Sequence, residues 1–564
     1  FGAVIVALSL LVPTVGEEVI TESPSSFGVD PVTGEPLDPD AVEGVVIDPE
    51  TGEVIDPETG EPVTSGSTGA AGGSGASGAG GGSSAGGSDQ QGAAGAEGVV
   101  GSGAATGGVA QCGGYQVPQD PYSPPCLKWS GGDNGGATSK GVTGDSIKVA
   151  VRLEAFTNGV ADALSRVAKA KIPNESTDKI TNTVEGLVEF FNRTYEFYGR
   201  KLELQIYSGA GIPAQEILGG GQESAQRDAL RVASELGSFV DASAITPPYL
   251  DALRQNKIIA VGAPFVSQSY MTQRRPYVWS PEPDCTVVAR SVASYYLQKM
   301  AGKPATLAKG PLQGKPRRLG IVAPDNAWYQ ECANTAIDIL NKGGAGSEIV
   351  LVDKYSVDLA NMAPQANSVT AKLRANDVTT VLCMCDPVLL VFLTTQTGNQ
   401  NYIPEWLQTG MAFTDLDLVG QIMDPREWNG AFGVSFRGPT LPTNAGPGYR
   451  AFKAVRPNEE PSQSSELMYG ILQIIAIGVQ LAGPNLTPES FEAGLFRYPA
   501  RTGALGTWKF GPGDYTPQQD AREVFYSAST RSPQNGDIGA WIDTSGGKSR
   551  YPIGGFPPGN PPNG

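Results

Sequence analysis

The first 127 residues of this 564-residue chain contain no lysine or arginine, and an ordinary mixed-charge sequence follows from near Cys112. Sixteen aspartates and glutamates lie within residues 1–110, so this segment carries nearly all of the net charge of −18. The remainder is close to neutral, so the acidity of the whole chain does not indicate basic partners for it. The sequence therefore predicts an acidic tether and a folded module, which is long enough for two lobes.

The tether has two parts. Residues 1–15 are mostly apolar, and we interpret them as the remnant of an export signal or membrane anchor. Residues 16–110 hold three Asp-Pro-x-Thr-Gly-Glu repeats, beginning at Asp30, Asp48 and Asp56, and then a Gly, Ser and Ala tract. Such a composition buries too little apolar surface to fold, so we predict a disordered linker. We expect an extracytoplasmic protein, either secreted or tethered through its N-terminus to a membrane or cell wall.

The composition and motifs of the chain also exclude several kinds of catalytic and binding site. The chain has no histidine, which removes Ser-His-Asp and Cys-His catalysis and His-ligated zinc. The segment Gly547-Lys548-Ser549 lacks the earlier glycine of a phosphate-binding loop, because position 542 is Ile. Basic clusters do not exceed pairs such as Arg317-Arg318, so nucleic acid binding is not expected. We predict a protein that is not an enzyme and uses neither a cofactor nor a metal.

Six cysteines occur in the chain. Cys112 and Cys126 flank a proline-rich segment where the module begins, and we predict a disulfide between them. Cys383 and Cys385 lie two apart on a predicted strand, so their side chains face the same way and are not expected to pair with each other. The partners of Cys285 and Cys332 stay open.

From Ser146 the sequence alternates short apolar strands with amphipathic helices, as is typical of a doubly wound α/β fold. A first series contains predicted strands at 147–151, 201–207, 239–241 and 258–261. A second series, opening near Asp284, contains predicted strands at 318–323, 348–352 and 379–383. Two such series predict two parallel-sheet lobes joined by a hinge. Ligands of such folds bind where the strands end and the helices begin.

The division of the module follows from these two series. We assign residues 111–282 to the first part of lobe 1 and residues 283–410 to lobe 2. Residues 411–510 are expected to return to lobe 1 and to form a crossover. The C-terminal segment 511–564 is expected to pack on lobe 2 and then to become disordered.

Several segments carry a family resemblance. They are Asp133-Asn-Gly-Gly-Ala-Thr-Ser-Lys-Gly-Val-Thr-Gly-Asp-Ser-Ile-Lys-Val149, Tyr198-Gly-Arg-Lys-Leu-Glu-Leu204, and Pro404-Glu-Trp-Leu-Gln-Thr-Gly410 running on to Trp428-Asn-Gly-Ala-Phe-Gly433. In this order, they resemble the type 1 periplasmic binding proteins, and within them the substrate-binding components of branched-chain amino acid ABC transporters and their actinobacterial relatives. The resemblance covers about residues 133–530. It implies a monomer that captures a small molecule and delivers it to an ABC permease.

The resemblance also implies ligand-binding residues, because the family holds its ligand between the lobes on the loops after the strands. In lobe 1, Ser243 and Thr246 would hold a ligand carboxylate, and Ala263 belongs to the loop that completes the pocket. In lobe 2 it implies aromatic walls and a partner for an ammonium group, at Asp325, Trp328, Tyr329, Asp386 and Thr409. Arg152, at the end of the first strand, is a further candidate for an anionic ligand.

Alternative interpretations stay open for these residues. Ser243, Thr246, Asp325 and Asp386 all stand where a helix cap would also explain them. The ligand does not follow from the resemblance, so amino acids, amides, short peptides and aromatic acids remain candidates. A surface-tethered sensing or adhesion module of the same fold is the alternative to transport. If the assignment is right, Ser243→Ala and Asp386→Ala weaken binding without unfolding the protein.

Overall fold

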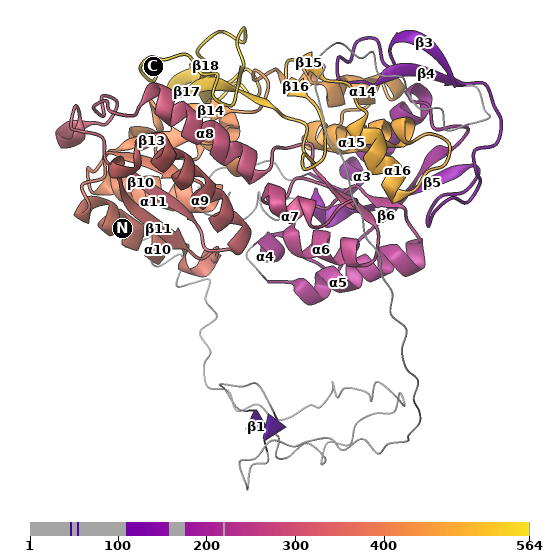
Figure 1. Cartoon of the computed structure of the whole chain (residues 1–564), viewed down its shortest axis with the longest axis horizontal. Coiled ribbons are helices and arrows are strands. Elements are labelled where there is room, and N and C mark those ends of the chain that lie inside the picture. Colours follow the sequence, from indigo (N-terminus) through magenta and orange to yellow (C-terminus); the bar gives the residue numbers. More distant parts are fainter. Residues whose placement is uncertain (1–45, 48–53, 56–108, 157–174, 218–219, 563–564) are drawn as a thin grey trace, which may run out of the picture. The chain divides into compact units, whose positions relative to one another are not determined.

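The computed structural model describes residues 46–47, 54–55, 109–156, 175–217 and 220–562 (Figure 1). The first hundred residues form a unit of their own. Within it only two short strands are described, and they pair antiparallel: β1 (Val46–Ile47) and β2 (Val54–Ile55). The predicted signal or anchor remnant and most of the predicted linker lie outside the described residues, so both stay predictions.

Lobe 1 is built on a parallel five-stranded sheet with the strand order β6-β5-β7-β8-β9. Its strands are β5 (Ser146–Arg152), β6 (Lys201–Tyr207), β7 (Val240–Asp241), β8 (Ile259–Val261) and β9 (Val278–Trp279). The helices between them are α3 (Thr177–Thr194), α4 (Pro213–Ile217), α5 (Gln222–Arg231), α6 (Pro247–Gln255) and α7 (Gln268–Thr272). The central strands are apolar and buried, as expected for a sheet with helices on both faces.

Three later helices complete lobe 1: α14 (Pro447–Val455), α15 (Ser465–Ala482) and α16 (Pro488–Phe496). Among the described residues, α15 is the one helix that is long and apolar enough to cross a membrane. It packs against α3, α14 and α16, and its side chains belong to the core of lobe 1. We therefore interpret α15 as a core helix. An N-terminal hairpin, β3 (Val109–Tyr115) and β4 (Pro125–Trp129), precedes the first lobe.

Lobe 2 contains an eight-stranded mixed sheet whose main path is β11-β10-β12-β13-β14-β17-β18. The parallel strands are β10 (Leu319–Pro324), β11 (Ile349–Tyr355), β12 (Thr380–Cys383), β13 (Glu405–Gln408) and β14 (Phe432–Ser435). The antiparallel strands are β17 (Asp520–Arg531), β18 (Ile538–Asp543) and β19 (Tyr551–Pro552). The helices are α8 (Cys285–Lys299), α9 (Ala327–Lys342), α10 (Met362–Ala375), α11 (Pro387–Asn399), α12 (Asp417–Gln421) and α13 (Pro425–Trp428).

The predicted fold class is confirmed, because two α/β lobes with parallel sheets are present. One boundary differs from the prediction. Residues 411–435 do not return to lobe 1, since β14 pairs with β13 and β17 in the second sheet. Figure 1 shows the later helices α14 to α16 with β5, and β17 and β18 beside β14. The C-terminal segment, described up to residue 562, lies on lobe 2, where Phe556 is buried against Tyr295.

Three crossover segments connect the lobes, at residues 280–284, 436–446 and 504–519. The third includes β16 (Gly506–Trp508), which pairs with β15 (Arg501–Gly503). The Arg550 guanidinium joins the second crossover to the start of β17, directly after the third crossover. It donates to the carbonyl oxygens of Phe436 and Arg437 at 2.8 and 2.9 Å and to the Asp520 carboxylate at 2.6 Å.

The disulfides correct one prediction. Cys383 and Cys385 are bonded to each other, although the sequence suggested that they would not pair. The prediction was wrong because β12 ends at Cys383, so the extended backbone that would keep these two side chains apart does not continue to Cys385. The two Cα atoms lie 5.0 Å apart. Cys285 pairs with Cys332 and joins α8 to α9. Cys126 is disulfide-bonded, but the side chain of Cys112 lies outside the described residues, so that pairing stays a prediction.

Candidate ligand-binding site

The predicted residues of lobe 1 meet in a buried group of charges at the carboxyl ends of the strands. The Arg152 guanidinium donates to both carboxylate oxygens of Glu216, at 2.7 and 2.8 Å, and to Asp228 at 3.2 Å. Its guanidinium carbon lies 3.9 Å from the ring centroid of Tyr249. The Thr246 hydroxyl donates to the same Glu216 carboxylate instead of capping α6. The predicted anion ligand Arg152 is therefore already paired within lobe 1.

Ser243 belongs to the same group. Its hydroxyl donates to Asp241 at 2.6 Å and accepts the backbone N–H of Arg152 at 2.9 Å. Tyr249 donates to the other oxygen of Asp241 at 2.6 Å. Burial raises the pKa of Asp241 to about 6 in spite of these hydrogen bonds. We call this group the strand-end cluster: Arg152, Glu216, Asp228, Asp241, Ser243, Thr246 and Tyr249.

The predicted acidic and hydroxyl residues of lobe 2 lie at separate places. Asp386 caps α11, accepting the backbone N–H groups of Val388 and Leu389 at 2.8 and 3.1 Å as well as the Tyr355 hydroxyl. Burial raises the pKa of Asp386. Thr409 accepts the N–H of Met411 at 3.2 Å, and Asp325 is exposed in the loop after β10. The interpretation of Asp386 as a helix cap therefore fits the structure. Ligand-binding roles for Asp325, Asp386 and Thr409 stay predictions.

The predicted aromatic residues stand where the lobes touch. The Trp328 ring at the start of α9 lies edge-on to Tyr270 of α7, with 5.7 Å between centroids, and it contacts Tyr329. Nearby, the hydroxyls of Ser267 and Ser269 donate to Glu331 at 2.8 and 2.6 Å. The rings of Phe265 and Phe413 add a third contact across the lobes at 4.9 Å, two residues after the buried Ala263. The two lobes are thus in direct contact at the strand ends.

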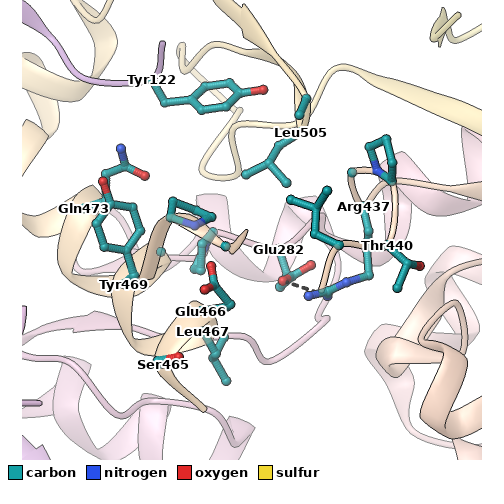
Figure 2. A pocket seen from close by; sticks show the side chains of 18 of the residues that line it. Tyr122, Glu282, Arg437, Thr440, Ser465, Glu466, Leu467, Tyr469, Gln473 and Leu505 are labelled. Carbon is teal, nitrogen blue, oxygen red and sulfur yellow. Dashed lines mark hydrogen bonds and ion pairs between the residues drawn. The ribbon is translucent and has the colours of Figure 1, made fainter. Parts of the chain in front are cut away.

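A cavity of about 310 Å³ lies at the crossover segments, and we call it the hinge cavity (Figure 2). All three crossovers line it, and so do the start of α15, the loop after β13 and the N-terminal loop Gln119–Tyr122. Its volume is in the range of small-molecule sites. Arg437 links the cavity to the lobe contact, because its guanidinium carbon lies 5.5 Å from the Phe413 ring centroid.

Charged groups face one another in the hinge cavity. Figure 2 shows Glu282 and Arg437 pointing toward each other, and their closest atoms are 3.2 Å apart. Asp120 accepts the Tyr469 hydroxyl at 2.9 Å and the Gln473 amide, and the Ser435 hydroxyl donates to Asp415 at 2.7 Å. Burial raises the pKa of Asp120, Glu282 and Asp415. Burial therefore disfavours the charged forms of these carboxylates, although Asp120 accepts three hydrogen bonds and Glu282 is paired with Arg437.

Three buried polar atoms in the cavity wall have no hydrogen-bond partner among the described residues. They are Oδ1 of Asp415, Oε1 of Gln518 and Nε1 of Trp508. Each of these atoms has almost no accessible surface of its own, so it is a buried polar atom within the wall.

Sequence reasoning missed the residues of the hinge cavity. They come from segments that are far apart in the chain, and each segment looks like an ordinary loop or helix start. The one local signal was Arg437, a charged residue directly after the apolar segment 432–436.

Comparison with known proteins agrees with the fold. The family model for periplasmic binding proteins matches residues 175–530, which is more than half of the chain. A search of curated proteins gave no significant match.

Many solved structures are similar to this chain at low sequence identity. An ABC transporter solute-binding protein from R. palustris, in complex with 4-hydroxybenzoate, is 13% identical over 71% of this chain and 96% of its own, with a TM-score of 0.49. The leucine binding protein LivK from Thermotoga maritima is 14% identical over 71% and 99%, with a TM-score of 0.46. A substrate-binding protein from Sphaerobacter thermophilus is 16% identical over 73% and 99%, with a TM-score of 0.47. From the extent of the family match, the chain belongs to the periplasmic binding protein family.

Proposed function

We propose that this protein is an extracytoplasmic solute-binding protein, which captures an amino acid or a related amide or acid between its lobes and delivers it to an ABC permease. The observation that supports this best is the hinge cavity, because both lobes and all three crossovers contribute to its wall. A cavity walled by crossovers changes shape when the lobes rotate, which couples binding to closure. The ligand undergoes no chemical change.

Closure in this proposal depends on contacts between the lobes that a ligand can stabilise. The Ser267 and Ser269 hydroxyls on Glu331, and the Trp328 ring against Tyr270, connect α7 of lobe 1 to α9 of lobe 2. Opening the lobes breaks these contacts. A ligand that binds the closed form better than the open form shifts the population toward closure, and the permease recognises that form.

The proposal also includes a role for the N-terminal segment. An N-terminal linker holds a monomeric binding module near a membrane or cell wall, where it meets the permease. Its reach lets the module collect solute away from that surface.

The first test is a thermal-shift screen of the full chain against amino acids, amides, short peptides and aromatic acids. A ligand that binds only the folded state stabilises it, by about 2.7 kcal/mol at a ligand concentration of about 100 Kd. We expect a saturable rise in Tm for one chemical class. No shift with any class contradicts solute binding.

Delivery needs a separate measurement. The permease is reconstituted in vesicles, and its ATPase rate is measured with the ligand-loaded protein and with the ligand-free protein. Stimulation by the loaded form supports transport. A protein that binds solute but leaves the rate unchanged is a sensor or adhesion module instead.

A further inference from the structure

One short segment of lobe 1, Phe265–Tyr270, contacts two helices of lobe 2, and we call it the closing segment. It runs from the loop after β8 into α7. Its last residue is anchored in lobe 1, because the Tyr270 hydroxyl donates to the carbonyl oxygen of Pro247 at 3.3 Å. The guanidinium carbon of Arg274 lies 3.3 Å from the Tyr270 ring centroid, and Val266 is buried in the core of lobe 1. The closing segment therefore moves with lobe 1 when the lobes separate.

The closing segment forms hydrogen bonds with the start of α8. The backbone N–H of Cys285 donates to the carbonyl oxygen of Val266 at 3.0 Å. In the opposite direction, the backbone N–H of Gln268 donates to the Thr286 hydroxyl at 3.0 Å. The Arg290 guanidinium donates to the side-chain oxygen of Gln268 at 3.1 Å. The amides of Cys285 and Gln268 thus have their acceptors on the opposite lobe, and both lose them when the lobes separate.

The closing segment also contacts the first two turns of α9. The hydroxyls of Ser267 and Ser269 donate to Glu331 at 2.8 and 2.6 Å. The Tyr270 ring lies edge-on to that of Trp328, with 5.7 Å between centroids. Trp328 and Glu331 are three residues apart, so they lie on the same side of the helix. One side of α9 therefore receives both the hydroxyls and the ring.

The Cys285–Cys332 disulfide joins these two helix starts. Cys285 is the first residue of α8, and Cys332 follows Glu331 directly on α9. The bond lies close to the contacts themselves. Sγ of Cys285 is 3.6 Å from the carbonyl oxygen of Trp328, and Sγ of Cys332 is 3.7 Å from the Thr286 hydroxyl. The lobe 2 groups that meet the closing segment are therefore gathered around one covalent bond between two helices.

A bond between α8 and α9 keeps these groups in a fixed arrangement, and a surface that is already rigid loses less conformational entropy when its partner docks. We propose that the starts of α8 and α9, held together by the Cys285–Cys332 disulfide, form the docking surface for the closing segment, and that the disulfide thereby controls lobe closure. The bridged cysteines act as positioning residues, since they need not touch the solute. This inference rests on the proposed function, because closure is the step to which solute binding is coupled.

The test measures lobe opening in the full chain by hydrogen–deuterium exchange and mass spectrometry, without solute. In the double variant Cys285→Ala and Cys332→Ala, we expect amides of the closing segment to exchange about tenfold faster than in the wild type, because their partners on lobe 2 are no longer held in place. Exchange of β10, in the core of lobe 2, should stay unchanged. The control is Cys383→Ala with Cys385→Ala, which removes a disulfide from a different core cluster of lobe 2 and should leave the closing segment unchanged.

A second variant covers the case in which loss of the disulfide also destabilises lobe 2. Glu331→Ala leaves the bond intact and loosens only the contact with α9, since Glu331 is exposed. If the bond makes the two helix starts one surface, the Cys285 amide on α8 should also exchange about threefold faster. Asp338→Ala, at another exposed position of α9, is the control and should change neither region.

Faster exchange of the closing segment in the Cys285 and Cys332 variant, with β10 unchanged, supports the inference. Exchange of the closing segment at the wild-type rate in that variant overturns it. If β10 also exchanges faster, Glu331→Ala decides: faster exchange of the Cys285 amide supports the inference, and an unchanged rate overturns it. None of these measurements needs a solute, so a negative result leaves solute binding intact, whereas a failed thermal-shift screen leaves the exchange result standing.

Discussion

The strand-end cluster and the hinge cavity both contain buried charges, but the protein satisfies them to different degrees. In the strand-end cluster Arg152 is paired with two carboxylates, and Asp241 accepts two hydroxyl groups. In the hinge cavity Asp415 and Gln518 each keep an oxygen without a partner. Arg152 also keeps one buried atom, Nε, without a hydrogen-bond partner, so the two groups differ in ion pairing and not in complete satisfaction. Arg152 forms ion pairs with Glu216 and Asp228, whereas Asp415 forms no ion pair among the described residues. We therefore expect substitutions in the strand-end cluster to lower the free energy of unfolding, and substitutions in the hinge cavity to change ligand affinity.

The largest expected effect is on the strand-end cluster. Arg152→Met leaves Glu216 and Asp228 buried without their cation, and breaking such a pair costs about 3 to 5 kcal/mol. The free energy of unfolding is measured in urea. The control is Arg193→Met, because Arg193 pairs with Glu189 on the exposed face of α3, where the cost is below about 1 kcal/mol. Similar losses in both variants would contradict the comparison.

The second prediction concerns pH. The pKa of Asp241 is raised from 3.8 to about 6 in the folded state, so the folded protein binds the proton more tightly than the unfolded chain. The stability that this proton provides is present below pH 4 and is lost as the pH rises through 6. Compared with Asp241→Asn, the wild type should lose on the order of 2 kcal/mol between pH 4 and pH 7. Urea melts of both proteins at several pH values measure the difference.

Asp178→Asn, at an exposed position of α3, is the control for that series. Because the Asp178 side chain is exposed, this variant should not reproduce the loss between pH 4 and pH 7 that is expected from the comparison with Asp241→Asn. The difference in free energy of unfolding between the wild type and Asp241→Asn could instead stay constant with pH or change in the opposite direction. Either result shows that the folded protein does not favour the protonated carboxyl of Asp241.

Ser243→Ala should lower the free energy of unfolding less than Arg152→Met does. Its effect on ligand affinity shows whether the strand-end cluster contacts the ligand. The change removes a donor to Asp241 and an acceptor for the Arg152 N–H, at a cost of about 1 to 2 kcal/mol. Since these partners are protein groups, ligand affinity should change less than threefold once the remaining folded protein is accounted for. A tenfold loss of affinity with unchanged stability would restore Ser243 as a ligand contact.

The smallest expected change in stability is that of Asp415→Asn. Its carboxylate has one oxygen without a partner and a pKa raised by burial, so removing the charge should alter the free energy of unfolding by less than about 1 kcal/mol. An unchanged or higher free energy of unfolding, together with weaker ligand binding, would support a binding role for Asp415, in contrast to the structural role of Arg152. A loss of several kcal/mol would place Asp415 among the structural charges.

Local periodicity was enough to predict most elements of the two lobes. The alternating residues from Lys201 to Tyr207 form β6 over that same range. The prediction missed the true place of β14, because a four-residue strand carries no information about which sheet it joins. The Cys383–Cys385 bond was missed because the extended backbone of the strand ends at Cys383, and the chain beyond it brings the two Cα atoms to 5.0 Å.

The site was predicted in part. Arg152, Ser243 and Thr246 do come together, because the carboxyl ends of parallel strands meet at one edge of the sheet. Their partners Glu216 and Asp228 lie on α4 and α5 and gave no signal in the sequence. Whether a charged residue at this edge meets a ligand or a protein carboxylate depends on the packing of helices that are remote in the chain.

The sequence by itself determined the acidic N-terminal segment and the two α/β series, because composition and periodicity are local properties of the chain. The family was suggested separately, by the resemblance of particular segments. Only the tertiary structure decided which charges are neutralised and which remain available. Five separate segments supply Asp120, Glu282, Asp415, Arg437 and Gln518. These residues share one cavity only because three crossovers, the loop after β13 and an N-terminal loop converge there. Burial and pairing are properties of that convergence, and they set the electrostatics that a ligand meets.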